Sequence, residues 1–321
     1  MKTGFIGLGN VGGKLAGSLL RNGIDLKVHD LDPALVANFV ARGAAEGGSP
    51  AAMMRDCDVV ITCLPSPAAS AAVVAEMLPE MGPGKIWMEM STTDADEILR
   101  LGAEVTATGG VAVECPVSGG CHRADTGNIS IFAGGPRSAV ETVMPLLKRL
   151  GRRILHTGEL GSASKLKVMT NYLATVHLVA LCEALTTMKA AGLDMATTYE
   201  AIRISSGTSF VHETESQLIL SGSRDVNFTM DLVMKDIGLF QKLADLGNVP
   251  LEISPLLIEI MSDGQRRYGE RAQSDRIIER LEEATGLSIL ADGFPTELID
   301  DEPEEEGYEI VRPATPVAAA E

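Results

Sequence analysis

Residues 3–12 read Thr3-Gly4-Phe5-Ile6-Gly7-Leu8-Gly9-Asn10-Val11-Gly12, so a short apolar run leads directly into the pattern G-x-G-x-x-G. Glycines at these positions leave bare backbone, against which a pyrophosphate group can lie at the N-terminus of the following helix. The pattern alone is weak, because a tight turn from strand to helix gives the same residues without any ligand. The neighbouring sequence decides between these two interpretations.

A second predicted strand, residues 26–30, follows this turn and ends in a carboxylate 18 residues after Gly12. In a dinucleotide-binding βαβ unit, an acidic residue at this place accepts hydrogen bonds from the adenosine ribose and repels a 2′-phosphate. No arginine follows Asp30 in residues 31–33. The sequence therefore predicts NAD rather than NADP as the cofactor, and Asp32 is expected to cap the next helix.

Up to about residue 160, short apolar runs alternate with helical stretches, which is typical of a parallel sheet flanked by helices. Beyond the two strands above, strands are predicted at residues 59–64, 86–90, 111–115, 129–133 and 153–157. We expect an α/β doubly wound sheet of the Rossmann type over residues 1–161, with NAD bound to it.

Beyond Gly161 the strand signals stop. An almost unbroken helix-forming stretch, residues 163–191, carries apolar residues on nearly every face, and such a helix is expected to be buried between two domains or two subunits. Further helices are predicted around residues 195–205, 210–221, 229–246, 256–268 and 274–284. We therefore expect an all-α domain over residues 162–285.

The end of the chain is strongly acidic. Residues 292–321 hold ten acidic residues against one basic residue, so −9 of the net charge of −17 lies there. This composition favours solvated disorder over residues 292–321, within an acidic C-terminal tail that we assign to residues 286–321. The alternative uses the sparse apolar residues of the tail as anchors for an arm docked on a neighbouring subunit.

Composition also limits the class of protein. A net charge of −17 over 321 residues supplies no basic face for nucleic acid. We expect no apolar run near the ~20 residues that span a bilayer and no signal peptide, and therefore a soluble, cytoplasmic protein. The five cysteines contain no C-x-x-C pair, which favours reduced thiols over disulfides or a metal site.

The residues narrow the reductase chemistry that could accompany a nicotinamide cofactor. None of the four tyrosines has a lysine four residues later, which excludes the Tyr-x-x-x-Lys of short-chain dehydrogenases, and the scattered Cys and His do not form a zinc ligand set. The remaining acid/base candidate is Lys167, four residues before Asn171, so that one helical face presents an ammonium group and an amide. On spacing alone, a solvated surface lysine without a chemical role is the other interpretation.

Four separated motifs, in this order, resemble those of the β-hydroxyacid dehydrogenases, whose type member is 3-hydroxyisobutyrate dehydrogenase. They are Gly7 to Gly12; Pro116-Val117-Ser118-Gly119-Gly120 with Gly127-Asn128 and Gly134-Gly135; Gly158, Gly161, Lys167 and Asn171; and Lys235-Asp236. The resemblance covers residues 1–285 and implies a homodimer or homotetramer whose helical domain serves substrate binding and dimerisation.

The resemblance also implies roles for individual residues. Lys167 would be the general acid/base, Asn171 would orient the substrate, and Lys235 would close over cofactor and substrate. The substrate carboxylate would be held by Ser118, Gly119 and Gly120. The cofactor-binding residues would be Gly7, Leu8, Gly9, Asn10, Val11, Gly12, Asp30, Leu64, Pro65, Thr92 and Lys235.

The chain departs from the family pattern in three places. Ala163 stands where the lysine motif has a third glycine, and Glu114 stands where an aspartate is more usual. Cys121-His122-Arg123 follows Gly120 where small apolar residues are more usual. A cation at Arg123 would read a second acidic group on the substrate, whereas an exposed loop without such a role is the other interpretation.

The predicted function is an NAD-dependent oxidoreductase that interconverts a small β-hydroxy acid and its semialdehyde or ketone by hydride transfer. Two alternatives remain. An imine reductase uses the same architecture but commonly replaces the lysine. A non-catalytic dinucleotide-binding scaffold, with the acidic tail as its interaction element, has no need for Lys167, Asn171 and Ser118 together.

Overall fold

The computed structural model describes residues 1–311, which fall into two compact units. The first unit comprises residues 1–164 and the segment that begins at residue 302. The second unit comprises residues 165–301. The sequence had suggested a boundary at residue 161 and a separate tail from residue 286. The last ten residues of that tail lie outside the described part of the chain.

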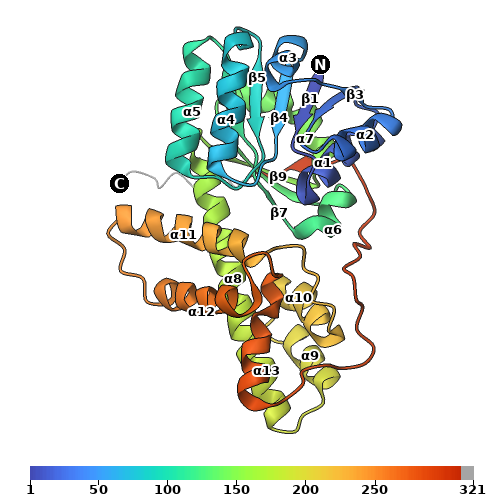
Figure 1. The fold of residues 1–321 in the computed structure, drawn as a ribbon, viewed down its shortest axis with the longest axis vertical. Helices are drawn as coiled ribbons and strands as arrows, with labels where there is room; N and C mark the ends of the chain where they lie inside the picture. Colours follow the sequence, from blue (N-terminus) through green and yellow to red (C-terminus); the bar gives the residue numbers. More distant parts are fainter. Residues whose placement is uncertain (312–321) are drawn as a thin grey trace, which may run out of the picture. The chain divides into compact units, whose positions relative to one another are not determined.

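The first unit is built on one sheet, in the spatial order β10-β9-β8-β6-β5-β4-β1-β2-β3, with β7 paired to β8 (Figure 1). Pairs in this sheet are parallel except β6 with β8 and β7 with β8. The strands are β1 (Thr3–Ile6), β2 (Leu26–His29), β3 (Ala45–Glu46), β4 (Val59–Thr62), β5 (Ile86–Glu89), β6 (Val111–Glu114), β7 (Val117–Ser118), β8 (Ser130–Gly134), β9 (Arg153–Gly158) and β10 (Tyr308–Glu309). The order β3-β2-β1-β4-β5-β6 is that of a dinucleotide-binding sheet, which confirms the doubly wound fold.

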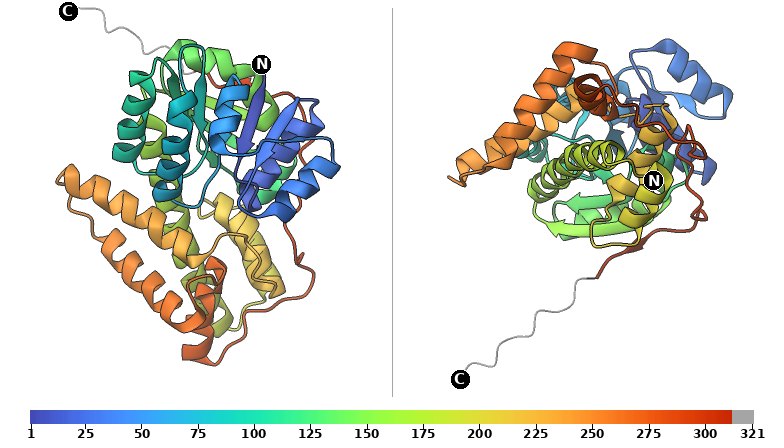
Figure 2. Two further views of the ribbon diagram at one scale, coloured as in Figure 1. Left: turned by 45° about the horizontal axis from the view of Figure 1, so that its top comes forward. Right: turned by 90° about the horizontal axis from the view of Figure 1, so that it is seen from below.

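Helices cover both faces of this sheet (Figures 1 and 2). They are α1 (Asn10–Arg21), α2 (Pro33–Ala41), α3 (Pro50–Asp56), α4 (Pro67–Met77), α5 (Ala95–Ala107), α6 (Gly120–Asp125) and α7 (Arg137–Leu150), with a short 3-10 turn at Leu78–Glu80. Several of these helices begin with a capping side chain followed by a proline. Asp32 accepts a hydrogen bond of 2.8 Å from Ala34 N and precedes a proline, so its predicted capping role is confirmed.

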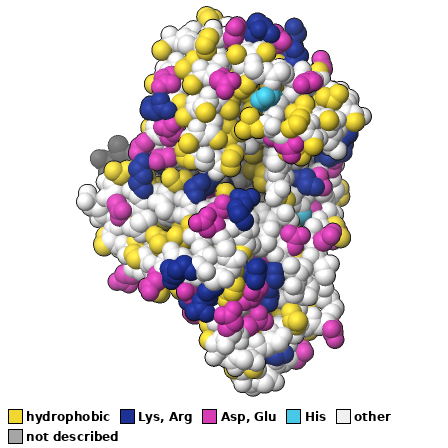
Figure 3. All heavy atoms as spheres, in the orientation of Figure 1, with side chains coloured by type: hydrophobic (Ala, Val, Ile, Leu, Met, Phe, Trp, Pro, Cys, Tyr) yellow, Lys and Arg dark blue, Asp and Glu magenta, His cyan; other side chains and the backbone are white. Residues whose placement is uncertain are grey.

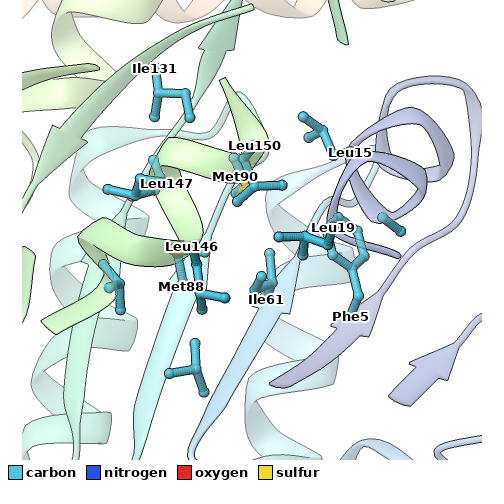
Figure 4. Packing of buried hydrophobic residues seen from close by; sticks show 14 of the residues in the cluster. Phe5, Leu15, Leu19, Ile61, Met88, Met90, Ile131, Leu146, Leu147 and Leu150 are labelled. Carbon is cyan, nitrogen blue, oxygen red and sulfur yellow. The ribbon is translucent and has the colours of Figure 1, made fainter. Parts of the chain in front are cut away.

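The strand alternation divides the apolar side chains between two cores. Phe5 and Ile61 point to one face, where they pack with Leu15, Leu19 and the side chains of α7 (Figure 4). Their neighbours along the strands, such as Ile6 and Val60, belong to the core on the opposite face. Successive residues of a strand point to opposite faces, and helices on both sides explain why these strands are apolar throughout.

The second unit is helical, as the sequence predicts. Its elements are α8 (Ser162–Ala190), of which the first three residues belong to the first unit, α9 (Met195–Arg203), α10 (Phe210–Ser221), α11 (Met230–Leu246), α12 (Ile253–Tyr268), a 3-10 turn (Ser274–Ile278) and α13 (Glu279–Thr285). A single core joins α8 to the other helices, with Leu178, Leu185, Ile219 and Ile237 among its buried residues.

Helix α8 departs from one expectation of the sequence. By length and composition it could cross a membrane, so the expectation that no apolar run approaches that length is wrong. Only 33% of its most apolar window is buried within the chain, and Leu173 is 43% exposed. The predicted burial of this helix between two domains or two subunits stays a prediction, because the structure describes a single chain. The core helix of a protein outside any membrane passes the same test of length and composition.

The expected disorder of the tail is wrong for residues 292–311. Leu287, Ile289 and Phe294 pack against the helical core. Farther along, β10 adds a parallel strand next to β9, where Tyr308 N donates to Arg152 O at 2.9 Å and Ile310 N to Ile154 O at 2.7 Å. The surface that receives this segment belongs to the same chain.

Ion pairs join this returning segment, residues 302–311, to the rest of the first unit. They join Arg21 to Glu304, Arg137 to Glu309, Lys148 to Glu306, Arg152 to Glu305 and Arg153 to Glu302. Composition shows the acidic residues, but it does not show that the fold brings cations from α1, α7 and the start of β9 next to them. Acidic and basic side chains are also interspersed on the face shown in Figure 3, which presents no broad basic surface.

Candidate active site

The glycine-rich turn lies between β1 and α1, and its three glycines serve different purposes. Gly7 has a φ of +96°, and a Cβ there would lie 2.2 Å from Cys63 O. A Cβ on Gly12 would lie 2.1 Å from Gly7 O, so this glycine allows the helix to pack on the strand. Around Gly9 nothing lies within 4 Å of an added Cβ. A ligand-free turn explains Gly7 and Gly12 but gives no reason for a bare backbone at Gly9.

The start of α1 fits a pyrophosphate group. The helix begins at Asn10, and within residues 1–311 no side chain caps it from Gly9 and no acidic side chain lies in its first turn. The first backbone N–H groups of a helix have no partner within the helix, and they carry a partial positive charge. The open side of Gly9 therefore leads to a helix end that can accept an anion.

Asp30 lies directly after β2, at the same edge of the sheet. Its Oδ2 accepts a hydrogen bond of 2.6 Å from Leu8 N, and its Oδ1 accepts one of 2.9 Å from Asp32 N. The carboxylate is thus hydrogen-bonded to the glycine-rich turn itself. The sequence alone does not predict this contact. That Asp30 binds the ribose of the cofactor stays a prediction.

The predicted nicotinamide-side residues follow β4 and β5. Leu64 N donates to Ser91 Oγ at 2.7 Å, which ties the loop carrying Leu64 and Pro65 to the loop carrying Ser91 and Thr92. Ser91 in turn donates from its backbone N to Glu89 Oε1 at 2.8 Å. Glu89 is fully buried, and this burial raises its pKa.

The predicted carboxylate-binding turn follows β6. Ser118 ends β7, and Gly119 and Gly120 have φ values of +135° and +82° that side-chain-bearing residues rarely adopt. The stem of Arg123 lies against this turn, because a Cβ on Gly119 would be 3.4 Å from Arg123 Cδ. Arg123 therefore lies next to the turn formed by the three residues that are predicted to bind the substrate carboxylate.

Lys167 is buried, with 7% of the residue exposed, so the interpretation as a solvated surface lysine is wrong. Its Nζ donates to Asn171 Oδ1 at 2.7 Å, as the four-residue spacing predicts. The other end of the amide, Nδ2 of Asn171, donates to Asp236 Oδ2 at 2.5 Å. Asp236 thus fixes which end of the Asn171 amide faces the lysine.

Burial governs the proton affinity of this lysine. Burial is the largest cause that lowers the pKa of Lys167, the negative charge of Asp236 opposes it and the positive charge of Lys235 adds to it, and together they bring the pKa to about 8. Nζ of Lys235 lies 3.2 Å from Oδ1 of Asp236, which is only 2% exposed. Lys167, Asn171, Lys235 and Asp236 therefore form one connected polar group in the helical unit.

The structure places the predicted residues in two groups. The glycine-rich turn, Asp30, Leu64, Pro65, Thr92 and the Ser118 turn with Arg123 belong to the first unit, and the lysine group belongs to the second. Within residues 1–311, no three His, Cys, Asp or Glu side chains are arranged to hold a metal ion. Sequence reasoning missed the roles of Asp236 and of the buried glutamates Glu89 and Glu114.

Comparison with known proteins gives two family models that together span most of the chain. Residues 2–158 match the NAD-binding domain of 6-phosphogluconate dehydrogenase. Residues 161–281 match a model described as the NAD-binding domain of NADP-dependent 3-hydroxyisobutyrate dehydrogenase.

Individual relatives agree with these models. The chain is 32% identical to 2-(hydroxymethyl)glutarate dehydrogenase of Eubacterium barkeri, over 90% of this chain and 97% of that protein. It is 29% identical to the mitochondrial 3-hydroxyisobutyrate dehydrogenase of Rattus norvegicus, over 80% of each. A solved structure of 3-hydroxyisobutyrate dehydrogenase from Salmonella typhimurium superposes with a TM-score of 0.80 at 25% identity, covering 87% of this chain and 99% of that one.

Proposed function

This chain belongs to the 3-hydroxyisobutyrate dehydrogenase-like family of β-hydroxyacid dehydrogenases, and we propose that it interconverts a small β-hydroxy acid and its semialdehyde or ketone, with NAD as cofactor. The bound nicotinamide would accept or deliver the hydride. The observation that carries the proposal is the buried lysine with its oriented amide, because a dinucleotide-binding protein without chemistry has no use for a lysine held in this way.

Lys167 would handle the proton of the substrate hydroxyl. With a pKa of about 8, a substantial fraction of its amine is neutral near neutral pH and can accept that proton during oxidation. In the opposite direction, the ammonium form would protonate the carbonyl oxygen. The bond to Asn171 uses one of the three ammonium donors and leaves the others for the reacting oxygen.

Asn171 would hold the lysine in place and contribute to substrate orientation. Its amide oxygen faces Lys167 because its amide nitrogen is bonded to Asp236. A reversed amide would place two groups of N–H donors opposite each other, so the carboxylate of Asp236 selects the productive orientation. Such preorganisation matters, because misplacement of a reacting group by about 1 Å can cost on the order of 100-fold in rate.

We propose that Ser118, Gly119 and Gly120 bind the carboxylate that all β-hydroxy acids have. We further propose that Arg123 binds a second carboxylate of the substrate. The contact between the Arg123 stem and Gly119 supports this assignment. The relative from Eubacterium barkeri is named for 2-(hydroxymethyl)glutarate, a dicarboxylate. A dicarboxylic β-hydroxy acid is therefore the substrate class that we favour for this chain.

Asp30 supports NAD over NADP. Its two oxygens are held by Leu8 N and Asp32 N at the edge of the sheet where the ribose of a dinucleotide lies in this fold. A 2′-phosphate would face this carboxylate, and no arginine follows in residues 31–33 to offset the repulsion.

We also propose that the chain acts as a homodimer or homotetramer in the cytoplasm. The incomplete burial of α8 and the exposure of Leu173 within one chain support association through the helical unit. Light scattering coupled to gel filtration measures the assembly directly, and a monomer at all concentrations would contradict this part of the proposal.

A substrate screen tests the proposed function. NAD reduction is followed by absorbance across a panel of monocarboxylic and dicarboxylic β-hydroxy acids, and cyclic amines are included because imine reductases share this architecture. We expect activity with β-hydroxy acids, highest for dicarboxylates. Arg123→Gln should raise KM for dicarboxylates while leaving monocarboxylates nearly unchanged. Turnover of amines alone would favour an imine reductase, and binding of NAD without any turnover would favour a scaffold.

A further inference from the structure

Glu114 occupies the end of β6, where it is fully buried. Its Oε1 accepts a hydrogen bond of 2.9 Å from Ala163 N, and its Oε2 accepts one of 3.0 Å from Ser164 N. The Ser164 hydroxyl also donates to Oε2. One carboxylate thus binds three donors in the first turn of α8.

The chemistry of a helix end explains this arrangement. The first backbone N–H groups of α8 have no partner within the helix and carry a partial positive charge, so a carboxylate is the group best suited to bind them. Burial raises the pKa of Glu114, and hydrogen bonds from the start of α8 oppose that rise. The three hydrogen bonds therefore offset part of the desolvation free energy that burial of the carboxylate costs.

The sheet leaves room for this contact. Gly134 is the register partner of Glu114 in the antiparallel pair of β6 and β8. A Cβ on Gly134 would lie 2.5 Å from Oε1 of Glu114, so any larger residue would displace the carboxylate. The Glu114 carboxylate thus lies between the start of α8 on one side and Gly134 on the other.

The same helix carries the catalytic lysine. Lys167 lies three residues after Ser164 on α8, which is less than one helical turn. A shift of the first turn therefore moves the lysine with it. Asn171 and Asp236 hold the amine end of Lys167, but nothing in that polar group holds the helix at its start.

We propose that Glu114 is a positioning residue, which fixes the start of α8 and thereby holds Lys167 in its buried place. This inference deepens the proposed function and rests on it as far as the chemistry of Lys167 is concerned. It adds a role for a residue in the nucleotide-binding unit that contacts no reacting atom.

A matched control exists on the neighbouring strand. Glu89 is the register partner of Glu114 in the parallel pair of β5 and β6, and it is equally buried. Its carboxylate binds Ser91 rather than α8. Glu89→Gln therefore removes a buried carboxylate of the same depth without touching the start of the helix.

The experiment compares Glu114→Gln, Glu114→Asp, Ser164→Ala and Glu89→Gln in the full-length protein. Glutamine offers one acceptor oxygen where three donors converge, so kcat should fall on the order of 10- to 100-fold in Glu114→Gln. The affinity for NAD should stay within about twofold, because no cofactor-binding group is changed. Aspartate should restore part of the rate, and Ser164→Ala should cause a smaller loss.

A second measurement follows Lys167 without turnover. The pH dependence of its acylation by acetic anhydride, read by mass spectrometry of its peptide, reports the pKa of the amine. Glu114→Gln should raise that pKa toward the ordinary lysine value, because a displaced lysine gains water, whereas Glu89→Gln should leave it unchanged. The charged neighbours of the amine, Lys235 and Asp236, are the same in both variants.

The outcomes separate this inference from the proposed function. An unchanged pKa of Lys167 in Glu114→Gln, or an equal rise in Glu89→Gln, would overturn the positioning role. If Lys167→Ala keeps its turnover, the proposed chemistry fails, while the acylation result still decides whether Glu114 positions the lysine. If Glu114→Gln does not fold, Ser164→Ala provides the same test, because it removes one donor only.

Discussion

Nζ of Lys167 lies 2.7 Å from Oδ1 of Asn171, inside a helical unit where the lysine is 7% exposed. An amine that is buried beside a neutral amide, rather than beside a carboxylate in direct contact, loses solvation without gaining full charge compensation. This relationship explains why its pKa is lowered and why it can exchange a proton near neutral pH.

Replacement of Lys167 by alanine should abolish most of the turnover. General acid/base catalysis contributes on the order of 100- to 10,000-fold, so kcat should fall by that factor, with little change in the dissociation constant of NAD. In the wild type, the rate of alcohol oxidation should rise with pH through about 8, because the proposed base is the neutral amine. Steady-state kinetics across pH and cofactor titration measure both effects, and a near-normal kcat would remove the assigned role.

Replacement of Asp236 by asparagine should change the pH profile as well as the rate. The negative charge of Asp236 raises the pKa of Lys167, so its removal should shift the profile to lower pH. The Asn171 amide also loses its anionic acceptor, and kcat should fall on the order of 10-fold or more through misorientation. A profile that stays in place or moves to higher pH would contradict this account of the lysine.

Replacement of Asp30 by alanine should weaken the preference for NAD over NADP. A hydrogen bond to a charged group contributes about 1.5–3 kcal/mol, so the ratio of kcat/KM for the two cofactors should change by roughly 10- to 100-fold. Asp32→Ala is the matched control, because its carboxylate caps α2 and should affect stability alone. An unchanged cofactor ratio in Asp30→Ala would show that another group selects the cofactor.

The helical unit should become less stable as pH rises. Burial raises the pKa of Glu215 to about 8 and that of Asp275 to about 7. The positive charge of Arg224 opposes the rise at Asp275, but Arg224 is already paired with Glu282 at 3.1 Å. Between their ordinary values and these raised values, the folded state binds more protons than the unfolded state. The free energy of unfolding should therefore decline from about pH 4 to about pH 8.

Glu215→Gln tests this decline, since the amide has no proton to release. One unit of pKa shift corresponds to about 1.4 kcal/mol, so the decline in the wild type should be several kcal/mol. Thermal melting at a series of pH values measures it, and the Gln variant should show a shallower dependence. Equal slopes in wild type and variant would rule out Glu215 as the source.

Truncation after Asp301 should destabilise the first unit. It removes β10 and the glutamates paired with Arg21, Arg137, Lys148, Arg152 and Arg153, and it exposes the edge of β9. Exposed ion pairs contribute only about 0–1 kcal/mol each, so a loss of a few degrees in Tm is expected. The uncovered strand edge should also promote association in gel filtration.

The control is truncation after Val311, which keeps the strand and all five ion pairs. This shorter truncation should melt like the full chain. High salt should lower Tm of the full chain more than Tm of the chain truncated after Asp301, because salt screens the ion pairs. Identical melting of both truncations would show that the returning segment contributes nothing to stability.

Local patterns were sufficient for much of this protein. The glycines between Ile6 and Gly12, the carboxylate of Asp30 and the spacing of Lys167 and Asn171 are visible in the chain, because each depends on residues close in sequence. All seven predicted strands of the sheet are present, and the predicted helices of the second unit agree within a few residues. Two-residue strands such as β3 and β7 escaped prediction, since so short a segment carries no periodic signal.

Contacts between distant residues could not be predicted in this way. Glu114 and Ser164, like Asn171 and Asp236, are brought together only when the chain folds. The tail shows the same limit, because its acidic composition favoured disorder while the arginines that bind it are spread between residues 21 and 153.

The sequence by itself determined the order of strands and helices, the dinucleotide-binding turn and the identity of the amine that would move a proton. Those features follow from steric and periodic rules that act over a few residues. Only the tertiary structure decided that this amine is buried, which carboxylates hold its amide and its helix, and where the acidic segment binds. Burial and long-range hydrogen bonding depend on which distant segments pack together, and they set the pKa on which the proposed chemistry rests.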